Sequence, residues 1–414
     1  MNILVLNAGS SSLKMSLYAM DNPRPLNEPE TVLAVGEIER IATAGTNLQI
    51  TVGQGAKLSR TVTAANIVEA ADQMLSLLLA PNTENDASSA GATAKSKALT
   101  VDAVGHRIVH GGPNFVQPVR IDASVVKDLH ALISLAPLHM PGCVAGVEAG
   151  LRLLPETPAV AVFDTAFHHD LPNVTAQYAL PRDLTTQHQL RRYGFHGISY
   201  QYVTERALLA LGQEATSTRL VLCHLGGGAS VCAVRDGKSI DVSMGFTPLE
   251  GLIMGTRSGD VDAGLVLYLL RTLNMSAEDV EQILNKKSGL LGLSGVSDDV
   301  RDLEKAAGEG NVHALAALEA FAYRTRKYIG AYAAALGGID ALIFTDKIGA
   351  HSFLTRSRIC QGLDFLGLGL DPARNVDINS PEPAAIGIGD GRRVWVIPTD
   401  EERQIAREVH TLLT

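Results

Sequence analysis

The fold of the first part of the chain is decided by ILVLNAGSSSLKMSLY, residues 3–18. Its apolar start predicts a strand over residues 3–6, and renewed alternation predicts a second, paired strand over residues 15–18. Glycine and serine at the bend between them leave backbone N–H groups uncovered, which favours an anion. The neighbouring hydroxyls and Lys14 support this interpretation. The alternative is a polar hairpin turn that binds no ligand.

The same pattern returns in the second half of the chain, in RLVLCHLGGGASVCAVRDGKSIDVSM, residues 219–244. A strand leads into a glycine-rich bend over residues 226–230, a second strand follows, and an Asp-Gly turn typical of hairpins leads to a third. We therefore expect a duplicated α/β core with a ligand-binding cleft between the two copies. A long alanine-rich helix is predicted over residues 312–336, where Gly337 ends it.

The length of 414 residues allows two domains, because single cores rarely grow beyond roughly 250–300 residues. We expect a first domain over residues 1–164, joined by the final helix over residues 401–414, and a second domain over residues 165–400. Residues 81–97 are small and polar, which predicts an exposed, mobile loop.

Composition excludes several classes of protein. The formal net charge of -9 argues against a nucleic-acid-binding protein, which would show a basic face. The 4 cysteines are scattered without a CxxC pair, which is typical of reduced thiols in a cytosolic protein. We expect no signal peptide, because a strand begins within three residues of the start, and no membrane span, because no run of ~18 apolar residues occurs.

Two arginines and a histidine lie in glycine-rich segments, and an arginine at a glycine-rich strand end is better placed to reach a ligand oxygen than one that pairs with carboxylates on a helix face. Arg107 lies in GHRIVHGG, Arg257 in GLIMGTRSGD and His196 in RRYGFHGISY. The planar fork of an arginine suits a carboxylate or a phosphate, although each of these residues could instead be structural. Asp164 ends a buried strand in PAVAVFDTAFH, where it could bind a divalent cation or accept from a backbone amide.

Nine segments resemble the acetate kinase family in their order and spacing, over nearly the whole chain. They are NAGSSSLK, GHRIVHGG, LAPLH, VFDTAFH, RRYGFHG, HLGGGAS, SMGFTPLEGLIMGTRSGD, LNKKSGLLGLSG and IPTDEE followed by IAR. The resemblance implies a duplicated actin-like (ribonuclease H-like) core, with two domains and an interdomain active-site cleft. It also implies reversible, direct in-line phosphoryl transfer from ATP to acetate, giving acetyl phosphate and ADP.

The family pattern implies a role for each matching residue. Catalytic roles fall to Arg107, Arg257, His196 and Asp164, with His196 and Arg257 stabilising the transition state. Acetate would bind to Arg107 and within an apolar pocket of Val109, Leu138, Phe195 and Pro248, which otherwise read as ordinary core. Mg²⁺, with Mn²⁺ as a substitute, would be organised by Asn7, Asp164 and Glu401. Phosphates and nucleotide would contact Ser10, Ser12, Lys14, His224, Gly226, Gly227, Gly228, Asp346, Lys347, Ile348 and Gly349. A cytoplasmic homodimer that contributes to acetyl-CoA formation is implied as well.

The chain departs from the family pattern at the expected nucleotide loop, FTDKIGAHS. Asp346 and Lys347 replace small residues, Ala350 replaces a glutamate, and His351 replaces an asparagine. Small residues let a backbone approach a nucleotide closely, so these changes leave two alternatives open. One is an acetyl phosphate-forming kinase with another donor, such as pyrophosphate. The other is a nucleotide-binding regulatory protein of the same fold with low activity.

Overall fold

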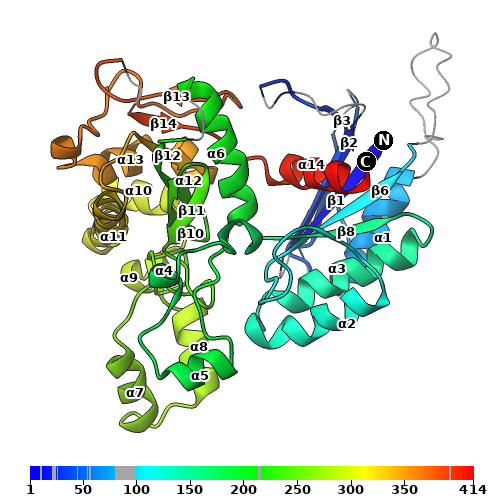
Figure 1. Cartoon of the computed structure of the whole chain (residues 1–414), viewed down its shortest axis with the longest axis horizontal. Helices are drawn as coiled ribbons and strands as arrows, with labels where there is room; N and C mark the ends of the chain where they lie inside the picture. The colour runs from blue at the N-terminus through cyan, green and yellow to red at the C-terminus, as the bar shows by residue number, and fades with distance from the viewer. Residues whose placement is uncertain are drawn as a thin grey trace. The chain divides into compact units, whose positions relative to one another are not determined.

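The computed structural model describes residues 1–9, 12–20, 25, 27–43, 45–53, 55, 57–79, 99–212, 216–390 and 393–414 (Figure 1). Ser10 and the loop predicted over residues 81–97 lie outside the described residues. The chain divides into two compact units. Unit 1 comprises Met1–Ala166 and Glu401–Thr414, and unit 2 comprises Phe167–Asp400.

Unit 1 is built on a mixed sheet with the strand order β5-β4-β3-β2-β1-β6-β8-β7. The strands are β1 Asn2–Ala8, β2 Ser12–Ala19, β3 Thr31–Glu39, β4 Asn47–Val52, β5 Leu58–Thr61, β6 Ala103–Ile108, β7 Val119–Arg120 and β8 Ala159–Phe163. The pairs from β1 to β5 are antiparallel, whereas β1, β6 and β8 run parallel. The residues of β8 are all buried, as expected for a strand covered on both faces.

Helices cover both faces of this sheet. They are α1 Ile67–Leu79, α2 Ala123–Ala131, α3 Met140–Leu153 and α14 Glu401–Leu413, with a 3-10 turn over Leu132–Leu135. Successive strand residues point to opposite faces. A Cβ at Gly105 of β6 would meet Ile405 and Val409 of α14, whereas the side chain of the next residue, His106, packs on Gly150 of α3. The helices α14 and α3 therefore lie on opposite faces, as Figure 1 shows.

Unit 2 repeats the central order, with a sheet of order β11-β10-β9-β12-β14-β13. Its strands are β9 Arg219–Leu225, β10 Ala229–Arg235, β11 Lys238–Val242, β12 Ala341–Thr345, β13 Ala384–Ala385 and β14 Val394–Val396. The order β10-β9-β12-β14 pairs antiparallel, parallel and parallel, as β2-β1-β6-β8 does in unit 1. Each copy also carries its glycine-containing bend between the first two strands. The predicted duplication of an α/β core is confirmed.

The helices of unit 2 include the long helix predicted from the sequence, α11, Val312–Leu336, with Gly337 in the left-handed conformation at its end. The others are α4 Asn173–Ala176, α5 Arg182–Gln187, α6 Gly197–Leu211, α7 Ala263–Arg271, α8 Ala277–Lys286, α9 Gly289–Ser294, α10 Val300–Gly308, α12 Asp346–His351 and α13 Phe353–Cys360. Short 3-10 turns cover Ala166–His168 and Asp364–Leu366. Among the described residues, no helix has the length and apolar character needed to cross a membrane.

Candidate active site

Three polar side chains of unit 1 come from the same edge of its sheet. Asn7 lies near the end of β1, Arg107 near the end of β6, and Asp164 directly after β8. Because these strands are parallel, their carboxyl ends meet at one edge, which is the edge that carries ligand sites in open α/β sheets. The structure thus brings together three of the residues predicted for catalysis and metal binding.

Arg107 is the centre of this cluster. Its Nη2 donates to Asp164 Oδ2 at 2.5 Å, its Nη1 donates to Asn7 Oδ1 at 3.4 Å, and its Nε lies 3.8 Å from Glu401 Oε2. Burial by itself lowers the pKa of Arg107, but the charges of Asp164 and Glu401 outweigh burial and raise that pKa above its ordinary value. The guanidinium is therefore a permanent positive charge flanked by two carboxylates.

The same cluster suits a hard divalent cation. Within the described residues, Asp164 Oδ1 is buried and has no hydrogen-bond partner, so one carboxylate oxygen is left for a ligand. No group of three His, Cys, Asp or Glu side chains stands close enough to hold a metal in the described ranges. Mg²⁺ does not need such a cage, because it retains several waters and commonly uses one or two carboxylates. Asn7, Asp164 and Glu401 fit this requirement.

Glu402 was not among the residues predicted for the site, yet it touches the cluster. Its Oε1 accepts from Asn7 Nδ2 at 3.0 Å. This bond fixes which amide atom of Asn7 faces Arg107, because the amide oxygen is the one that remains to accept. The only sequence signal for Glu402 is its place beside Glu401 at the start of a helix.

The remaining predicted residues of unit 1 lie at the same edge or close to it in sequence. Lys14 on β2 pairs across the ladder with Asn7 of β1, and such directly opposed residues share a face of the sheet. Ser12 is the first residue of β2. Val109 directly follows β6 and is buried, and half-buried Leu138 lies in the turn before α3. Ser10 lies outside the described residues.

His196 of unit 2 is held at a strained position directly before α6. Its backbone has φ 58, in the left-handed region that few non-glycine residues adopt. Its Nδ1 lies 2.8 Å from Ser230 Oγ, and Tyr200 OH lies 2.5 Å from the same oxygen. Ser230 and Tyr200 were not predicted for the site, although both fall inside or beside the motifs that carry it. The opposite ring nitrogen of His196, Nε2, faces the bend at Gly228. A Cβ built at Gly228 would lie 3.3 Å from this nitrogen.

Arg257 contacts the same bend, because a Cβ at Gly228 would lie 3.2 Å from its Nη2. Its Nη1 donates to the Pro248 carbonyl oxygen at 2.6 Å. Burial lowers the pKa of Arg257 to about 10, so the group still carries its charge at neutral pH. In the part of the chain that the structure describes, no carboxylate lies within ion-pair distance of it. A partly buried cation of this kind is suited to an anionic ligand.

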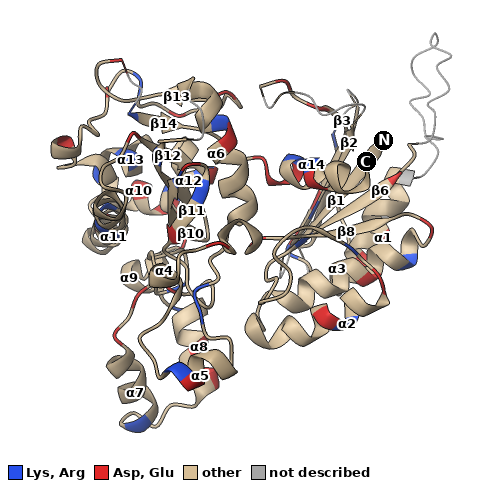
Figure 2. Ribbon diagram, in the orientation of Figure 1, with Lys and Arg blue, Asp and Glu red and all other residues tan. Residues whose placement is uncertain are grey.

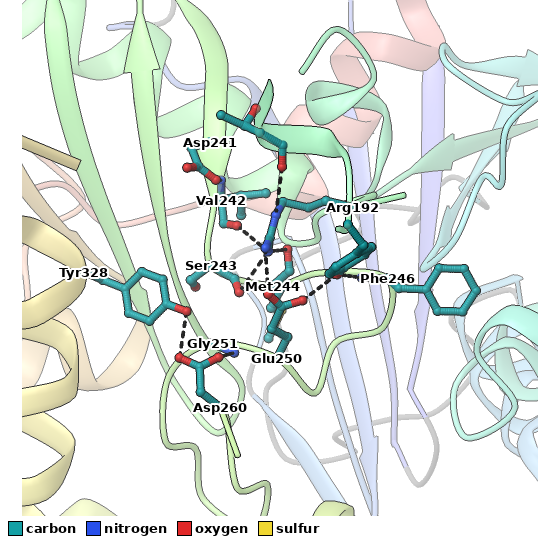
Figure 3. Close-up of polar contacts among 12 residues, drawn as sticks. Arg192, Asp241, Val242, Ser243, Met244, Phe246, Glu250, Gly251, Asp260 and Tyr328 are labelled. Carbon is teal, nitrogen blue, oxygen red and sulfur yellow. Dashed lines mark hydrogen bonds and ion pairs between the residues drawn. The ribbon is translucent and has the colours of Figure 1, made fainter. Parts of the chain in front are cut away.

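A polar network fixes the segment that presents Pro248 and Arg257 (Figure 3). Arg192 Nη2 donates to Glu250 Oε1 at 2.6 Å, and Arg192 Nη1 donates to the carbonyls of residues 242–244. Tyr178 OH donates to Glu250 Oε2 at 2.5 Å and accepts from the backbone N–H of Phe246 at 2.8 Å. The turn that contains Pro248 is therefore held by hydrogen bonds at Phe246 before that residue and at Glu250 after it.

The far end of this segment is closed by a second group of contacts. Asp260 Oδ1 accepts from the backbone N–H of Gly251 at 2.8 Å, and Asp260 Oδ2 accepts from Tyr328 OH at 2.8 Å (Figure 3). The backbone of residues 254–258 is bonded to residues 284–291, where Gly289 has a left-handed φ of 64. A side chain at Gly289 would collide with the Met254 carbonyl oxygen, which explains the glycine at this position.

The nucleotide segment was expected to be a loop, and this expectation is wrong in one respect. Residues Asp346–His351 form the short helix α12. The fully buried Arg356 explains this, since its Nη1 donates at 2.7 Å to the carbonyl oxygens of both Gly349 and Ala350. These bonds satisfy carbonyls that a helix end leaves without intrahelical partners. Lys347 is exposed on α12, Ile348 is half-buried, and His351 pairs with Asp377 at 2.7 Å.

The glycine-rich bend of residues 226–228 also brings His224 and Asp346 together. His224 Nε2 lies 3.3 Å from Asp346 Oδ2, and Ser199 Oγ lies 2.9 Å from His224 Nδ1. The ring of His224 stacks on that of His196, with centroids 4.1 Å apart. Gly227 is exposed, and a Cβ there would meet no atom within 4 Å. Within unit 2, the predicted residues His196, Arg257, His224 and Asp346 thus converge on one bend.

Comparisons with known proteins identify the family of the chain. The sequence profile of the Acetokinase family matches residues 2–407. The chain is 45% identical to an acetate kinase of Geobacillus sp. (strain WCH70) over 407 residues, with 98% of each chain covered, and 44% identical to one of Bacillus subtilis (strain 168) with the same coverage.

Solved structures give the same result. The acetate kinase of Porphyromonas gingivalis matches with a TM-score of 0.85 and 40% identity over 100% of both chains. A propionate kinase from Francisella tularensis matches with a TM-score of 0.86 and 37% identity over 99% of both chains. The chain therefore belongs to the acetokinase family, a family of transferases that phosphorylate the carboxyl group of acetate.

Proposed function

We propose that the chain transfers the γ-phosphoryl group of ATP to a carboxylate oxygen of acetate, reversibly, to give acetyl phosphate and ADP. The observation that carries this proposal is Arg257, a partly buried guanidinium that faces a glycine-rich bend and has no carboxylate partner among the described residues. A phosphoryl group is the ligand that such a charge suits, and family membership names the acceptor.

In this proposal the protein supplies positive charge and position, and it performs no covalent step. A carboxylate oxygen of acetate attacks the γ-phosphorus, the bond from that phosphorus to the bridging oxygen breaks, and ADP leaves with the electron pair. No proton moves, because acetate is already ionised at neutral pH. Two anions must meet, so Arg107, Arg257 and a hydrogen bond from His196 offset the charge of the transferred group.

The divalent ion, proposed to be Mg²⁺ with Mn²⁺ as a substitute, neutralises phosphate charge when it is bound. Asn7, Asp164 and Glu401 would hold it, partly through water. Arg107 keeps Asp164 oriented for this task through the 2.5 Å bond to Oδ2. The second carboxylate oxygen of Asp164 stays available to the ion.

We assign acetate to Arg107, and we propose that Val109, Leu138, Phe195 and Pro248 contact its methyl group, as the family pattern implies. One methylene changes binding by only ~1–3 kcal/mol in an apolar pocket, so propionate should react more weakly than acetate. We assign the nucleotide and its phosphates to unit 2, through His224, the bend of residues 226–228 and residues 347–349, with Asp346 at the border of this site. Lys14 and Ser12, together with Ser10 as the family pattern implies, are proposed to complete the phosphate contacts.

The alternatives left open by the changed nucleotide segment gain no support. No observation on the described residues favours a pyrophosphate donor or a regulatory protein of low activity. The side chains expected for catalysis are buried at Asp164 and partly buried at Arg107, His196 and Arg257. The full-length relatives and solved structures cited above are acetate and propionate kinases.

A homodimer is also proposed, and α7 supports it. This helix, AGLVLYLLR, is almost wholly apolar yet buries no residue in the single chain. Leu265, Leu267 and Tyr268 are each exposed, and Figure 2 shows the helix free of charged residues except at its basic end. A second copy of the chain would cover this face. A cytoplasmic location is proposed too, and the four cysteines support it because all are free and buried.

The test is to incubate the protein with acetate, MgATP and hydroxylamine and to measure acetyl hydroxamate. The proposal expects hydroxamate that depends on ATP and acetate, and a loss of rate of about 100-fold or more in Arg257→Ala, because one preorganised charge stabilises the transition state by several kcal/mol. Arg301→Ala is the matched control, since this exposed arginine of unit 2 pairs with nearby Asp299. Product with pyrophosphate but not with ATP would overturn the proposal.

A further inference from the structure

Asp346 fills space that the glycine-rich bend leaves open. A Cβ built at Gly226 would lie 1.9 Å from Asp346 Oδ2, so this carboxylate packs directly on the Gly226 backbone. Any other residue at 226 would have to displace it. The Asp346 side chain is 26% exposed and His224 is 6% exposed, so the carboxylate faces the bend from a largely enclosed position.

The backbone of Asp346 is strained in this arrangement. Its φ of 62 lies in the left-handed region, which glycine adopts freely and aspartate adopts only at a cost. The contact with His224, whose Nε2 lies 3.3 Å from Asp346 Oδ2, helps to hold the side chain against the bend. A small residue, as in the family pattern, would have neither the strain nor the charge.

The bend is therefore electrostatically asymmetric. At its Gly228 end it contacts the Arg257 guanidinium and the His196 ring, and at its Gly226 end it contacts the Asp346 carboxylate. A transferred phosphoryl group would lie at the cationic end. The phosphates that remain with the nucleotide would then approach the anionic end.

From this we infer that Asp346 is a specificity-determining residue that weakens nucleotide binding, because its carboxylate occupies a phosphate-oxygen position beside His224 at the Gly226 end of the bend. The inference rests on the proposed function in one respect only, which is that the bend binds nucleotide phosphates. A bound nucleoside diphosphate or triphosphate must push the carboxylate aside or sit beside a like charge. Either way, affinity is lower than the bend alone would give.

Asp346→Asn separates charge from shape, because asparagine has the same size and tolerates a left-handed φ. We expect this variant to bind MgADP about 5- to 10-fold more tightly than the parent in calorimetry, the size of one screened charge pair at short range. Asp346→Gly, which also removes the backbone strain, should bind at least as tightly. The gain should shrink at high salt, which screens charge but not shape. In kinetics, KM for MgATP should fall while KM for acetate stays unchanged.

Asp377→Asn is the matched control. It removes a carboxylate that contacts helix α12 at a different residue, His351. Its MgADP affinity should equal that of the parent. Equal or weaker MgADP binding by Asp346→Asn would overturn the inference, as would an equal gain in Asp377→Asn. Calorimetry needs no turnover, so failure of acetate phosphorylation with tighter binding by Asp346→Asn would reject the proposed reaction and leave the role of Asp346 standing.

Discussion

Arg107 donates to one oxygen of Asp164 at 2.5 Å, while the other oxygen of that carboxylate is buried without a partner among the described residues. The carboxylate is thus oriented by the arginine and left with one free coordination position. This relationship links two residues that are 57 positions apart in sequence. One oxygen of Asp164 thus fixes the orientation of the carboxylate, and the other oxygen remains for the metal ion.

Asp164→Asn should therefore lose both activity and metal affinity. We expect kcat to fall about 100-fold or more and the Mg²⁺ concentration for half-maximal rate to rise, because an amide replaces the charged ligand. Titration of the rate with Mg²⁺ after chelation measures both effects. Asp72→Asn is the control, since Asp72 also pairs with an arginine, Arg152, but at the exposed surface of unit 1. A parent-like Mg²⁺ titration for Asp164→Asn would remove Asp164 from the metal site.

Glu250 is expected to matter for activity through the segment that presents Arg257. Glu250→Ala leaves Arg192 and Tyr178 without their shared acceptor, which should lower the free energy of unfolding by about 1–3 kcal/mol. We expect kcat to fall more than either KM changes, with Glu250→Gln partly restoring it because the amide oxygen still accepts. Steady-state kinetics and urea unfolding check this. The control is Glu281→Ala, which alters an exposed side chain of α8 and should change neither kcat nor stability. A kcat of Glu250→Ala equal to that of the parent would refute the positioning role of Glu250.

Helix α14, which carries Glu401, is fastened to unit 1 by a buried charge network. The Glu30 side chain is only 2% exposed and pairs with Arg403 and, at 2.7 Å, with Arg407. Removing one partner from such a buried network typically costs about 3–5 kcal/mol, so Glu30→Ala should lower unfolding stability by that amount. Glu28→Ala alters an exposed side chain two residues away and should change it by about 0.5 kcal/mol or less. Equal denaturation midpoints for the two variants would contradict this assignment.

Stability should fall between pH 6.5 and pH 4 because of His106. Burial lowers its pKa to about 4, against about 6.5 when the chain is unfolded. Above pH 6.5 the residue is neutral in both states, whereas below it only the unfolded chain gains the proton. That difference removes up to about 3 kcal/mol of stability by pH 4.

The check is to measure unfolding free energy against pH for His106→Leu, in which the slope over this window should flatten. His188→Gln replaces an exposed histidine and should leave the slope as it is. An unaltered slope in His106→Leu would show that other groups cause the acid sensitivity.

The fold was predictable because its signals are local. Apolar runs before and after residues 9–11, and before and after residues 226–228, each predict two strands joined by a bend. Gly337 ends its helix through its own backbone conformation, which does not depend on what the helix packs against. The residue types of the site were predictable from motifs for the same reason. Arg107 lies near the end of a strand, and His196 and Arg257 lie in glycine-rich connections, so all three stand in motifs that can be read without a structure.

Contacts between distant positions were not predictable. Asn7 bonds to Glu402 across 395 residues, and Tyr178 bonds to Glu250 across 72, so no spacing rule relates them. The nucleotide segment was expected to be a loop because the family resemblance implies one, but it forms a helix whose last carbonyls accept from the buried Arg356, a residue outside the motif. The placement of Asp346 on Gly226 likewise depends on the packing of β12 beside β9.

The most direct test of the central claim follows the bridging oxygen of the product. Acetate labelled with ¹⁸O in its carboxyl group is incubated with MgATP, and the phosphorus resonance of acetyl phosphate is recorded. Direct attack of the carboxylate on the γ-phosphorus predicts ¹⁸O in the bridge to phosphorus, with ADP as the other product. An unlabelled bridge, or acetyl adenylate with pyrophosphate in place of acetyl phosphate with ADP, would contradict it.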